Sequence, residues 1–338
     1  MNLQDINPKE FKLPPTAEVI RGNIIKHGNP LALKGSEIAA WAKELNLPAK
    51  GETLLYTGGE YQMLPYIDGL LKTMTIMDQG SKAFSMAMGL RNLINKTGIS
   101  AEKVYASVLA KDRKRYNEIS YKAALTLQKF GLDFCYLGEK ELYSGALLYE
   151  LGFWNDLKTH ARKVTDLFKE AGAKTIICLS PHSAELFKFI YPKLVEDFNF
   201  EIKTYTEIIY GLIKEKRITI SGITDSKVVI HDSCVLAREL GITEEMRKIL
   251  NDIEGVKLVE AKQNRKWTTC CGGPCKILFP EMSSKIADYR ANELKETEAE
   301  LILTFCPYCM ASINKSIESE ENNLKVEDFI EFIYKGVV

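Results

Sequence analysis

Cysteine is the residue whose number and spacing offer the most chemistry in this sequence. The chain has eight cysteines in 338 residues, and six of them follow residue 230. A small exported domain would use such residues as disulfide staples, but this chain is large, and its first 21 residues carry several charges and no apolar signal stretch. Cysteines gathered in one half of an intracellular protein indicate metal binding or redox chemistry instead.

Five of these cysteines form a spaced pattern in three separate turns. Thirty-five residues separate Cys234 from the pair Cys270-Cys271, and 34 residues separate that pair from Cys306-x-x-Cys309. Thiolates are soft donors that suit iron–sulfur clusters or zinc. Neighbouring side chains normally diverge, so an adjacent pair suits a cluster that touches both better than it suits one zinc ion. The following Gly272-Gly273 lets the backbone approach a cluster and offer N–H groups to its sulfides. We therefore predict that one iron–sulfur cluster binds to five residues: Cys234, Cys270, Cys271, Cys306 and Cys309.

The elements that must position these cysteines are short apolar runs that we predict to be buried strands. Each run is followed by a turn rich in Gly, Ser, Pro or Cys and then by a helical pattern, which is typical of βαβ units and a parallel sheet. Functional residues in such sheets gather beyond the carboxyl ends of the strands. We therefore expect an α/β fold with the cluster at the carboxyl edge of the sheet. The predicted strands are residues 54–56, 175–178, 228–231 and 301–305.

A weak internal repeat predicts two pseudo-repeated modules, each with parallel-sheet βαβ units. We expect a lead-in segment over residues 1–51, a first module over 52–225 and a second module over 226–338 that carries the cluster. Three pairs of segments recur in the same order: Tyr143-Ser144-Gly145 with Cys270-Cys271-Gly272, Ser180-Pro-His-Ser183 with Cys306-Pro-Tyr-Cys309, and Ile202–Tyr210 with Val326–Tyr334.

Composition excludes several classes of partner. The chain has 45 Lys and Arg residues against 45 Asp and Glu residues, so no strong global field favours nucleic acid or an anionic membrane. No apolar stretch approaches the roughly 20 residues that a membrane span needs. We expect a soluble, cytoplasmic protein that does not bind nucleic acid, and a partner must hold it if it works in a membrane-associated complex.

The residues around the cysteines resemble a known family. His231–Cys234, Cys270–Gly273 and Cys306–Cys309 are similar to the three turns of the cysteine-rich CCG domain, found in the B and D subunits of heterodisulfide reductase and in related subunits of glycerol-3-phosphate, lactate and succinate oxidoreductases. Weaker similarity covers about residues 23–338. The resemblance implies one non-cubane [4Fe–4S] cluster per chain, whereas the spacing alone does not distinguish it from an ordinary cubane.

The first module departs from the pattern of relatives that carry two complete motifs. None of its five corresponding positions can supply a thiolate, so we predict that this module binds no cluster. An organic cofactor, a partner's side chain or simple packing are all open as the occupant of that site. The five positions are Gly59, Tyr143, Ser144, Ser180 and Ser183.

The resemblance implies an oxidoreductase subunit that carries electrons to or from a thiol/disulfide, a quinone or a partner flavoprotein. We expect a flavoprotein or ferredoxin-like partner, because Gly58-Gly59 lacks the full dinucleotide fingerprint. The alternative is a non-catalytic assembly or anchoring subunit with a structural cluster or zinc. A third interpretation, a cofactor-free thiol oxidoreductase using Cys270, Cys271 and Cys275, leaves Cys306 and Cys309 unexplained.

Residues near the pattern are further candidates. Cys275 is a packing residue or an auxiliary redox-active thiol, and His231 is a hydrogen-bond donor behind the ligands or a local structural residue. We expect Asp232 to cap the following turn, and we expect His182 to act as a helix cap or surface residue rather than to contact a substrate or bind a metal. Trp267 is expected in the core.

Two groups of residues outside the pattern have a plainer interpretation. Cys135 and Cys178 lie in apolar contexts and are expected to be buried structural cysteines, since free Cys packs as a small hydrophobe. Tyr143 fills the core or lines a substrate cavity.

Overall fold

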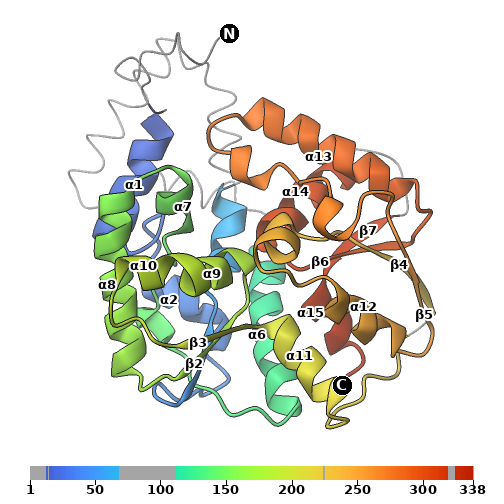
Figure 1. Ribbon diagram of the computed structural model, residues 1–338, viewed down its shortest axis with the longest axis horizontal. Coiled ribbons are helices and arrows are strands. Elements are labelled where there is room, and N and C mark those ends of the chain that lie inside the picture. The colour runs from blue at the N-terminus through green and yellow to red at the C-terminus, as the bar shows by residue number, and fades with distance from the viewer. Residues whose placement is uncertain (1–12, 14, 68–111, 224, 319–323, 338) are drawn as a thin grey trace.

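Two parallel β-sheets form the framework of the protein. The computed structural model describes residue 13 and residues 15–67, 112–223, 225–318 and 324–337. One sheet has the order β1-β2-β3 and the other has the order β5-β4-β6-β7, and the neighbouring strands within each sheet are parallel. Figure 1 shows the two sheets in separate halves, with the orange and red second half beside the blue-to-yellow first half. The predicted α/β fold with two modules is confirmed. The strands are β1 (Thr53–Tyr56), β2 (Thr175–Cys178), β3 (Glu201–Thr204), β4 (Ser226–Ile230), β5 (Val256–Val259), β6 (Leu301–Thr304) and β7 (Lys325–Asp328).

The four predicted strands correspond to β1, β2, β4 and β6. Strands β2, β4 and β6 lie inside their sheets, and β1 pairs with β2. All four residues of β6 are buried, as expected for a central strand covered on both faces. In the outer strands β3 and β7, buried residues alternate with exposed or half-buried ones, and β5 has no buried residue. Strands β3 and β7 each have a single apolar residue among four, and β5 is only four residues long and is interrupted by Lys257, so no long apolar run predicts these three strands.

Helices connect the strands on both sides of each sheet. In the described part of the first half, the helices are α1 (Pro15–His27), α2 (Gly35–Ile38), η2 (Ala39–Ala42), α6 (Arg113–Lys129), η3 (Gly138–Lys140), α7 (Ala146–Glu150), α8 (Trp154–Glu170), α9 (Pro181–Glu185), η4 (Leu186–Ile190), α10 (Tyr191–Leu194) and α11 (Tyr205–Lys214). Those of the second half are η5 (Val235–Glu239), α12 (Glu244–Asn251), η6 (Arg265–Trp267), η7 (Gly273–Cys275), α13 (Pro280–Lys295), α14 (Pro307–Glu318) and α15 (Phe329–Tyr334).

The internal repeat is visible in the last strand and helix of each half. Helix α11 begins with a capping box in which the Glu207 carboxylate accepts from the Thr204 N–H at 2.8 Å. Helix α15 begins the same way, with Glu331 accepting from the Asp328 N–H at 3.2 Å. A capping box satisfies backbone donors at the start of a helix. The two halves therefore share this local structure as well as the order of their strands.

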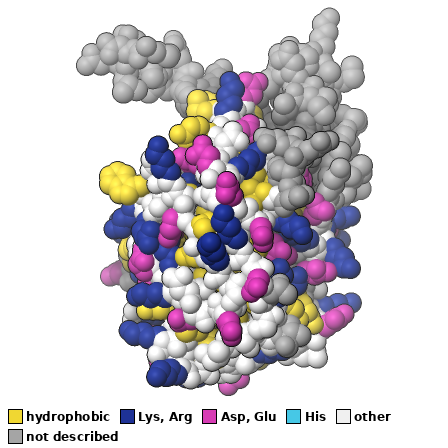
Figure 2. All heavy atoms as spheres, turned by 90° about the vertical axis from the view of Figure 1, so that its right-hand side faces the viewer, with side chains coloured by type: hydrophobic (Ala, Val, Ile, Leu, Met, Phe, Trp, Pro, Cys, Tyr) yellow, Lys and Arg dark blue, Asp and Glu magenta, His cyan; other side chains and the backbone are white. Residues whose placement is uncertain are grey.

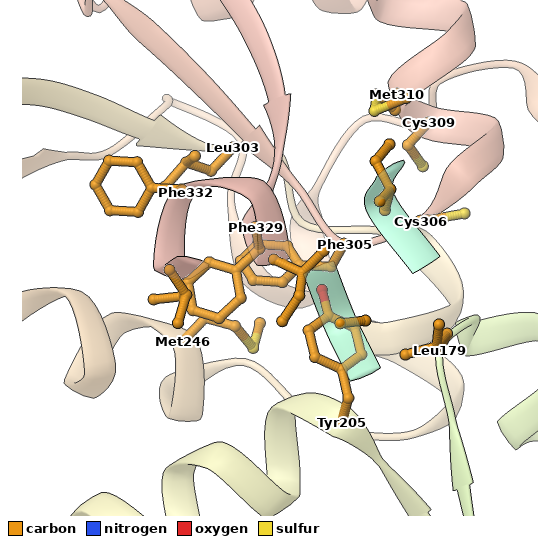
Figure 3. Packing of buried hydrophobic residues seen from close by; sticks show 14 of the residues in the cluster. Leu179, Tyr205, Met246, Leu303, Phe305, Cys306, Cys309, Met310, Phe329 and Phe332 are labelled. Atoms are coloured by element: carbon orange, nitrogen blue, oxygen red, sulfur yellow. The ribbon is translucent and has the colours of Figure 1, made fainter. Parts of the chain in front are cut away.

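The two halves pack through one continuous apolar core. Helix α6 of the first half packs on α15 of the second (Figure 1), and the rings of Tyr205 and Phe329 lie 6.5 Å apart. The Tyr61 hydroxyl donates to Asp328 at 2.6 Å. Figure 3 shows Cys306 and Cys309 at the border of this core, beside residues from both halves. The domain boundaries predicted at residues 51 and 225 stay a prediction.

The surface carries both signs of charge. Figure 2 shows Lys and Arg side chains interspersed with Asp and Glu over the described part of one face, as the balanced composition suggests. Within the ranges that the structure covers, no helix is both long and apolar enough to cross a membrane.

Candidate metal centre

The structure brings the five patterned cysteines to the carboxyl edge of the second sheet. Cys234 follows β4 and Cys306 follows β6, and these two strands are hydrogen-bonded neighbours. The pair Cys270-Cys271 lies between η6 and η7, and the sulfurs of Cys234 and Cys270 are 3.8 Å apart. The sulfurs of Cys271 and Cys309 lie within 4.8 Å of each other and of a ring nitrogen of His231. All eight cysteines are free thiols, so no disulfide competes for these sulfurs.

The glycine pair after Cys271 shapes the loop that carries two of the thiols. Gly272 has φ +79°, and a Cβ atom there would lie 2.4 Å from the Ser283 carbonyl oxygen of α13. A Cβ atom at Gly273 would lie 3.4 Å from the Cys271 sulfur. The Gly272 N–H points at the Cys270 sulfur at 3.4 Å. Glycine is therefore required at position 272, both for the backbone conformation and for the close approach of α13.

A buried ionic network supports the turn that carries Cys234. Both oxygens of Asp232 accept from the Arg247 guanidinium at 2.8 Å, and the Arg265 N–H donates to the same carboxylate at 2.7 Å. Arg247 also binds Glu260 through two hydrogen bonds. The expectation that Asp232 caps the following turn is wrong, because its carboxylate accepts from Arg247 and from the Arg265 N–H instead. The network ties α12 and the loop after β5 to the end of β4.

The hydrogen bonds of His231 assign its tautomer. The Arg290 Nε–H donates to His231 Nδ1 at 3.1 Å, and Nδ1 is therefore an acceptor. Burial and the Arg290 charge lower the pKa of His231 well below its usual value, so the ring is neutral and its proton lies on Nε2. Nε2 has no partner among the described residues, although the side chain is fully buried. His231 Nε2 therefore offers the thiols an N–H group and not a lone pair. Such a nitrogen can donate a hydrogen bond to sulfur, but it cannot bind a metal ion in this tautomer.

Hydrogen bonds between the thiols shift the pKa values of their sulfurs in opposite directions. Hydrogen bonds from Cys234 and Cys271 lower the pKa of Cys270 to about 2, and the hydrogen bond to Cys270 raises the pKa of each of these two donors. Five thiolates cannot coexist in so small a buried space without positive charge. A metal group supplies that charge, and its binding releases the remaining protons. The donor set, the N–H groups and the space allowed by the glycines all fit an iron–sulfur cluster.

The corresponding site of the first half is filled by a buried carboxylate. Glu60 accepts from the Ser180 hydroxyl at 2.6 Å and from the Ser183 hydroxyl, and these serines stand where the second half has Cys306 and Cys309. All three side chains are buried, and burial raises the pKa of Glu60. Sequence reasoning missed Glu60. The available signal was an acidic residue directly after Gly58-Gly59 at the end of an apolar strand.

The site of the first half also contains a packed tyrosine. Tyr143 is 1% exposed, its hydroxyl accepts from the Leu147 N–H at 3.1 Å, and its backbone carbonyl contacts His160 at 2.5 Å. It belongs to the core, which is one of the two roles expected from the sequence. None of the five corresponding positions bears a sulfur.

His182 lies between the two sites. It is 6% exposed, its Nδ1 lies 3.7 Å from the Cys306 sulfur and its Nε2 lies 3.9 Å from the Glu150 carboxylate. Burial lowers the pKa of His182, but Cys306 and Glu150 outweigh burial and raise it to about 10, so both ring nitrogens carry protons. The expected role as a helix cap or surface residue is wrong. That expectation considered only the residues next to His182 in the sequence, whereas its partners Cys306 and Glu150 lie in other segments of the fold.

The remaining candidates divide into buried and exposed residues. Cys135 and Cys178 are fully buried, as predicted. Cys275 is partly exposed in η7, and its role as an auxiliary thiol stays a prediction. Trp267 is 82% exposed, so its expected place in the core is wrong. It belongs to a single 3₁₀ turn beside the cysteine pair, where no second layer of the described chain covers it.

Comparison with known proteins shows what the second half resembles. Residues 228–314 match the family of the cysteine-rich domain CCG. This range contains all five patterned cysteines, the end of strand β4 and the whole of strand β6. The part of the second half that positions the cysteines is therefore similar to CCG cysteine-rich domains.

The chain is similar in sequence to a subunit of heterodisulfide reductase and to a quinone oxidoreductase. It is 29% identical over 225 residues to the D subunit of the dihydromethanophenazine:CoB–CoM heterodisulfide reductase of Methanosarcina acetivorans, covering 65% of this chain and 55% of that protein. It is also 29% identical to the EtfAB:quinone oxidoreductase of Syntrophomonas wolfei, covering 73% of this chain and 36% of that protein. The chain thus spans about half the length, or less, of these curated relatives.

One solved structure supports the fold. A hypothetical protein from Helicobacter pylori superposes with a TM-score of 0.50 at 12% identity, covering 65% of this chain and 45% of that chain. At this identity the likeness concerns the arrangement of helices and strands alone.

Proposed function

We propose that this chain is a heterodisulfide-reductase-like electron-carrying subunit that holds one iron–sulfur cluster in its second half. The observation that carries the proposal is the convergence of five free thiols from three turns at one sheet edge, beside an imidazole N–H that has no other partner in the described chain. A structural zinc ion needs four ligands and leaves the fifth thiol without a role. A cluster held there would supply one-electron transfer.

The five cysteines would hold the cluster, and the residues behind them would orient it. Arg290 keeps the His231 proton directed at the sulfurs, and Arg247 holds the Cys234 turn through Asp232. Such partners behind the ligands tune a metal site and fix ligand orientation. We further propose a non-cubane [4Fe–4S] type, which the resemblance of the cysteine turns to the CCG family implies.

Electrons would enter or leave where the ligands are least covered. Cys234 and Cys270 are partly exposed, whereas the other three ligands are buried. Relatives are named as a subunit of a larger reductase and as a quinone oxidoreductase, and we propose that this chain likewise exchanges electrons with a flavoprotein or ferredoxin-like partner. The acceptor or donor at the other end is a thiol/disulfide, a quinone or a further carrier.

The first half would hold no cluster. Glu60 already accepts both hydroxyls that stand in place of ligand thiols, and its buried carboxylate occupies the space that cluster ligands would need. We therefore propose one cluster per chain. A mechanism in which two clusters attack one disulfide symmetrically is not open to this chain alone.

Iron and acid-labile sulfide per chain, measured on anaerobically purified protein, test the proposal. We expect about four of each in the wild type. Cys309→Ala should lower the iron content by more than half, whereas Cys178→Ala, which removes an equally buried thiol from the first half, should leave it unchanged. About eight irons would contradict the single site. Zinc without sulfide would favour the alternative of a structural or anchoring subunit.

Electron paramagnetic resonance before and after thiol addition separates two modes of action. A signal changed by the thiol indicates direct thiol/disulfide chemistry at the cluster. An unchanged signal at the same iron content indicates a relay between protein partners.

A further inference from the structure

We propose that His182, supplied by the half of the chain that lacks ligand cysteines, donates a hydrogen bond to the Cys306 sulfur and thereby raises the reduction potential of the cluster in the other half. The inference rests on the proposed function, because it requires a cluster ligated by Cys306. It assigns a role to the first half that its missing cysteines do not suggest.

The repeat explains how His182 reaches the second half. Ser180-Pro-His-Ser183 corresponds to Cys306-Pro-Tyr-Cys309, so His182 is the counterpart of Tyr308. The two rings meet edge to face at 5.0 Å with an interplanar angle of 75°. Tyr308 in turn contacts the Tyr143 hydroxyl in the first half. His182 of the first half therefore contacts Cys306 in the second half, and Tyr308 of the second half contacts Tyr143 in the first half.

The residues that replace the ligands in the first half hold this imidazole in place. Ser180 and Ser183 flank His182 in the same turn, and both hydroxyls donate to Glu60. Glu60 thus clamps the turn on both sides of His182. Beyond the ring, Glu150 faces Nε2 at 3.9 Å, and Nδ1 faces the Cys306 sulfur at 3.7 Å. A Cys306 sulfur bound to a cluster carries no proton, so Nδ1 is the donor of this contact and the ligand sulfur is its acceptor.

A hydrogen bond to a ligand sulfur changes the potential through charge. Reduction adds an electron to the cluster and its ligands, so the sulfur becomes a stronger acceptor and the bond strengthens. Both partners are buried, Cys306 completely, and water does not screen the interaction. The reduced state therefore gains more from His182 than the oxidised state does.

The test compares midpoint potentials by redox titration of three variants. His182→Leu removes the donor, and we expect the equilibrium constant for one-electron reduction to fall about tenfold, which lowers the potential by about 59 mV. His182→Asn places an amide N–H near the position of Nδ1 and should restore at least half of that difference. His160→Leu removes another buried histidine of the first half, which contacts a backbone carbonyl and no cysteine, and should leave the potential unchanged.

Iron and sulfide are measured on each preparation, so that the two proposals fail separately. A wild type without a cluster would contradict the proposed function. A wild type with a cluster, together with a His182→Leu variant of the same potential, would overturn this inference alone. Releasing the clamp with Ser180→Ala and Ser183→Ala together should also lower the potential.

A second measurement needs no variant and decides the matter if His182→Leu does not retain iron. The wild type is labelled with ¹⁵N-histidine and studied by electron–nuclear double resonance in its paramagnetic state. Coupling to two histidine nitrogens, from His182 and His231, supports the inference. Coupling to one nitrogen overturns it.

Discussion

Replacement of Arg247 by leucine should destabilise the protein strongly, because it leaves a buried carboxylate without its counter-charge. Asp232 is fully buried and would keep one hydrogen bond, from the Arg265 N–H. Removing one partner of a buried ion pair costs about 3–5 kcal/mol. Glu260, whose side chain is 35% exposed, can be hydrated and adds little. For 338 residues that unfold as one unit, this cost lowers Tm by about 4–7 °C.

The assay is anaerobic thermal unfolding followed by circular dichroism at one scan rate. Arg162→Leu is a matched control, because Arg162 pairs with Asp197 at the surface, with both side chains about half exposed. An exposed pair contributes less than about 1 kcal/mol, so this control should melt within about 1–2 °C of the wild type. Asp232→Asn combined with Arg247→Leu should recover part of the loss, since no charge is then buried alone. A double variant as unstable as the sum of the two single variants would refute the reasoning.

Three further predictions follow from the geometry of the sites. Gly272→Ala should lower the iron content by at least half, because a Cβ atom there would meet a carbonyl oxygen of α13 at 2.4 Å, whereas Gly131→Ala, with a similar φ of +75° and open space, should keep its iron. Burial raises the pKa of Asp328 from 3.8 to about 7, so the folded chain holds a proton that the unfolded chain loses. Its contribution to the free energy of unfolding is complete below about pH 4 and declines up to about pH 7, and the fall of Tm between pH 5 and pH 8 should be smaller in Asp328→Asn than in the wild type. Ser180→Cys combined with Ser183→Cys should leave the iron content no higher than that of the wild type, because the buried Glu60 carboxylate still occupies that site. A rise toward eight irons per chain would show that the lack of thiols, and not the carboxylate, keeps a cluster out of the first half.

Much of the fold could be predicted because its signals are local. The central strands β2 and β6 are continuous apolar runs, and a run of this kind shows its burial within a few residues. The repeat was detectable because each half ends in a strand followed by a helix with a capping box. The two capping residues are three positions apart in both halves, within one helical turn, so the sequence shows the pattern directly. Outer strands were missed because they are short and contain few apolar residues in a row, and pairing with a neighbouring strand is what identifies them.

The sequence by itself determined which residues can act as thiolate ligands. Turns that follow the parallel strands of one sheet lie at the same edge of that sheet, and Cys234 and Cys306 both lie in such turns. The absence of thiols from the first half's five corresponding positions was equally plain, since a serine cannot replace a thiolate whatever its surroundings. Both conclusions depend on residue type and on the geometry that every parallel sheet shares.

Only the tertiary structure decided what surrounds these ligands. His182 and Cys306 are 124 positions apart in the chain, and Glu60 and Ser183 are 123 positions apart. The tautomer of His231 likewise depends on Arg290, a contact across 59 positions. A buried polar group takes its partner from whichever element packs against it, and that packing is settled by the whole core. Periodicity and spacing describe only the residue's own segment, so they predict the candidate ligands but not the groups that surround them.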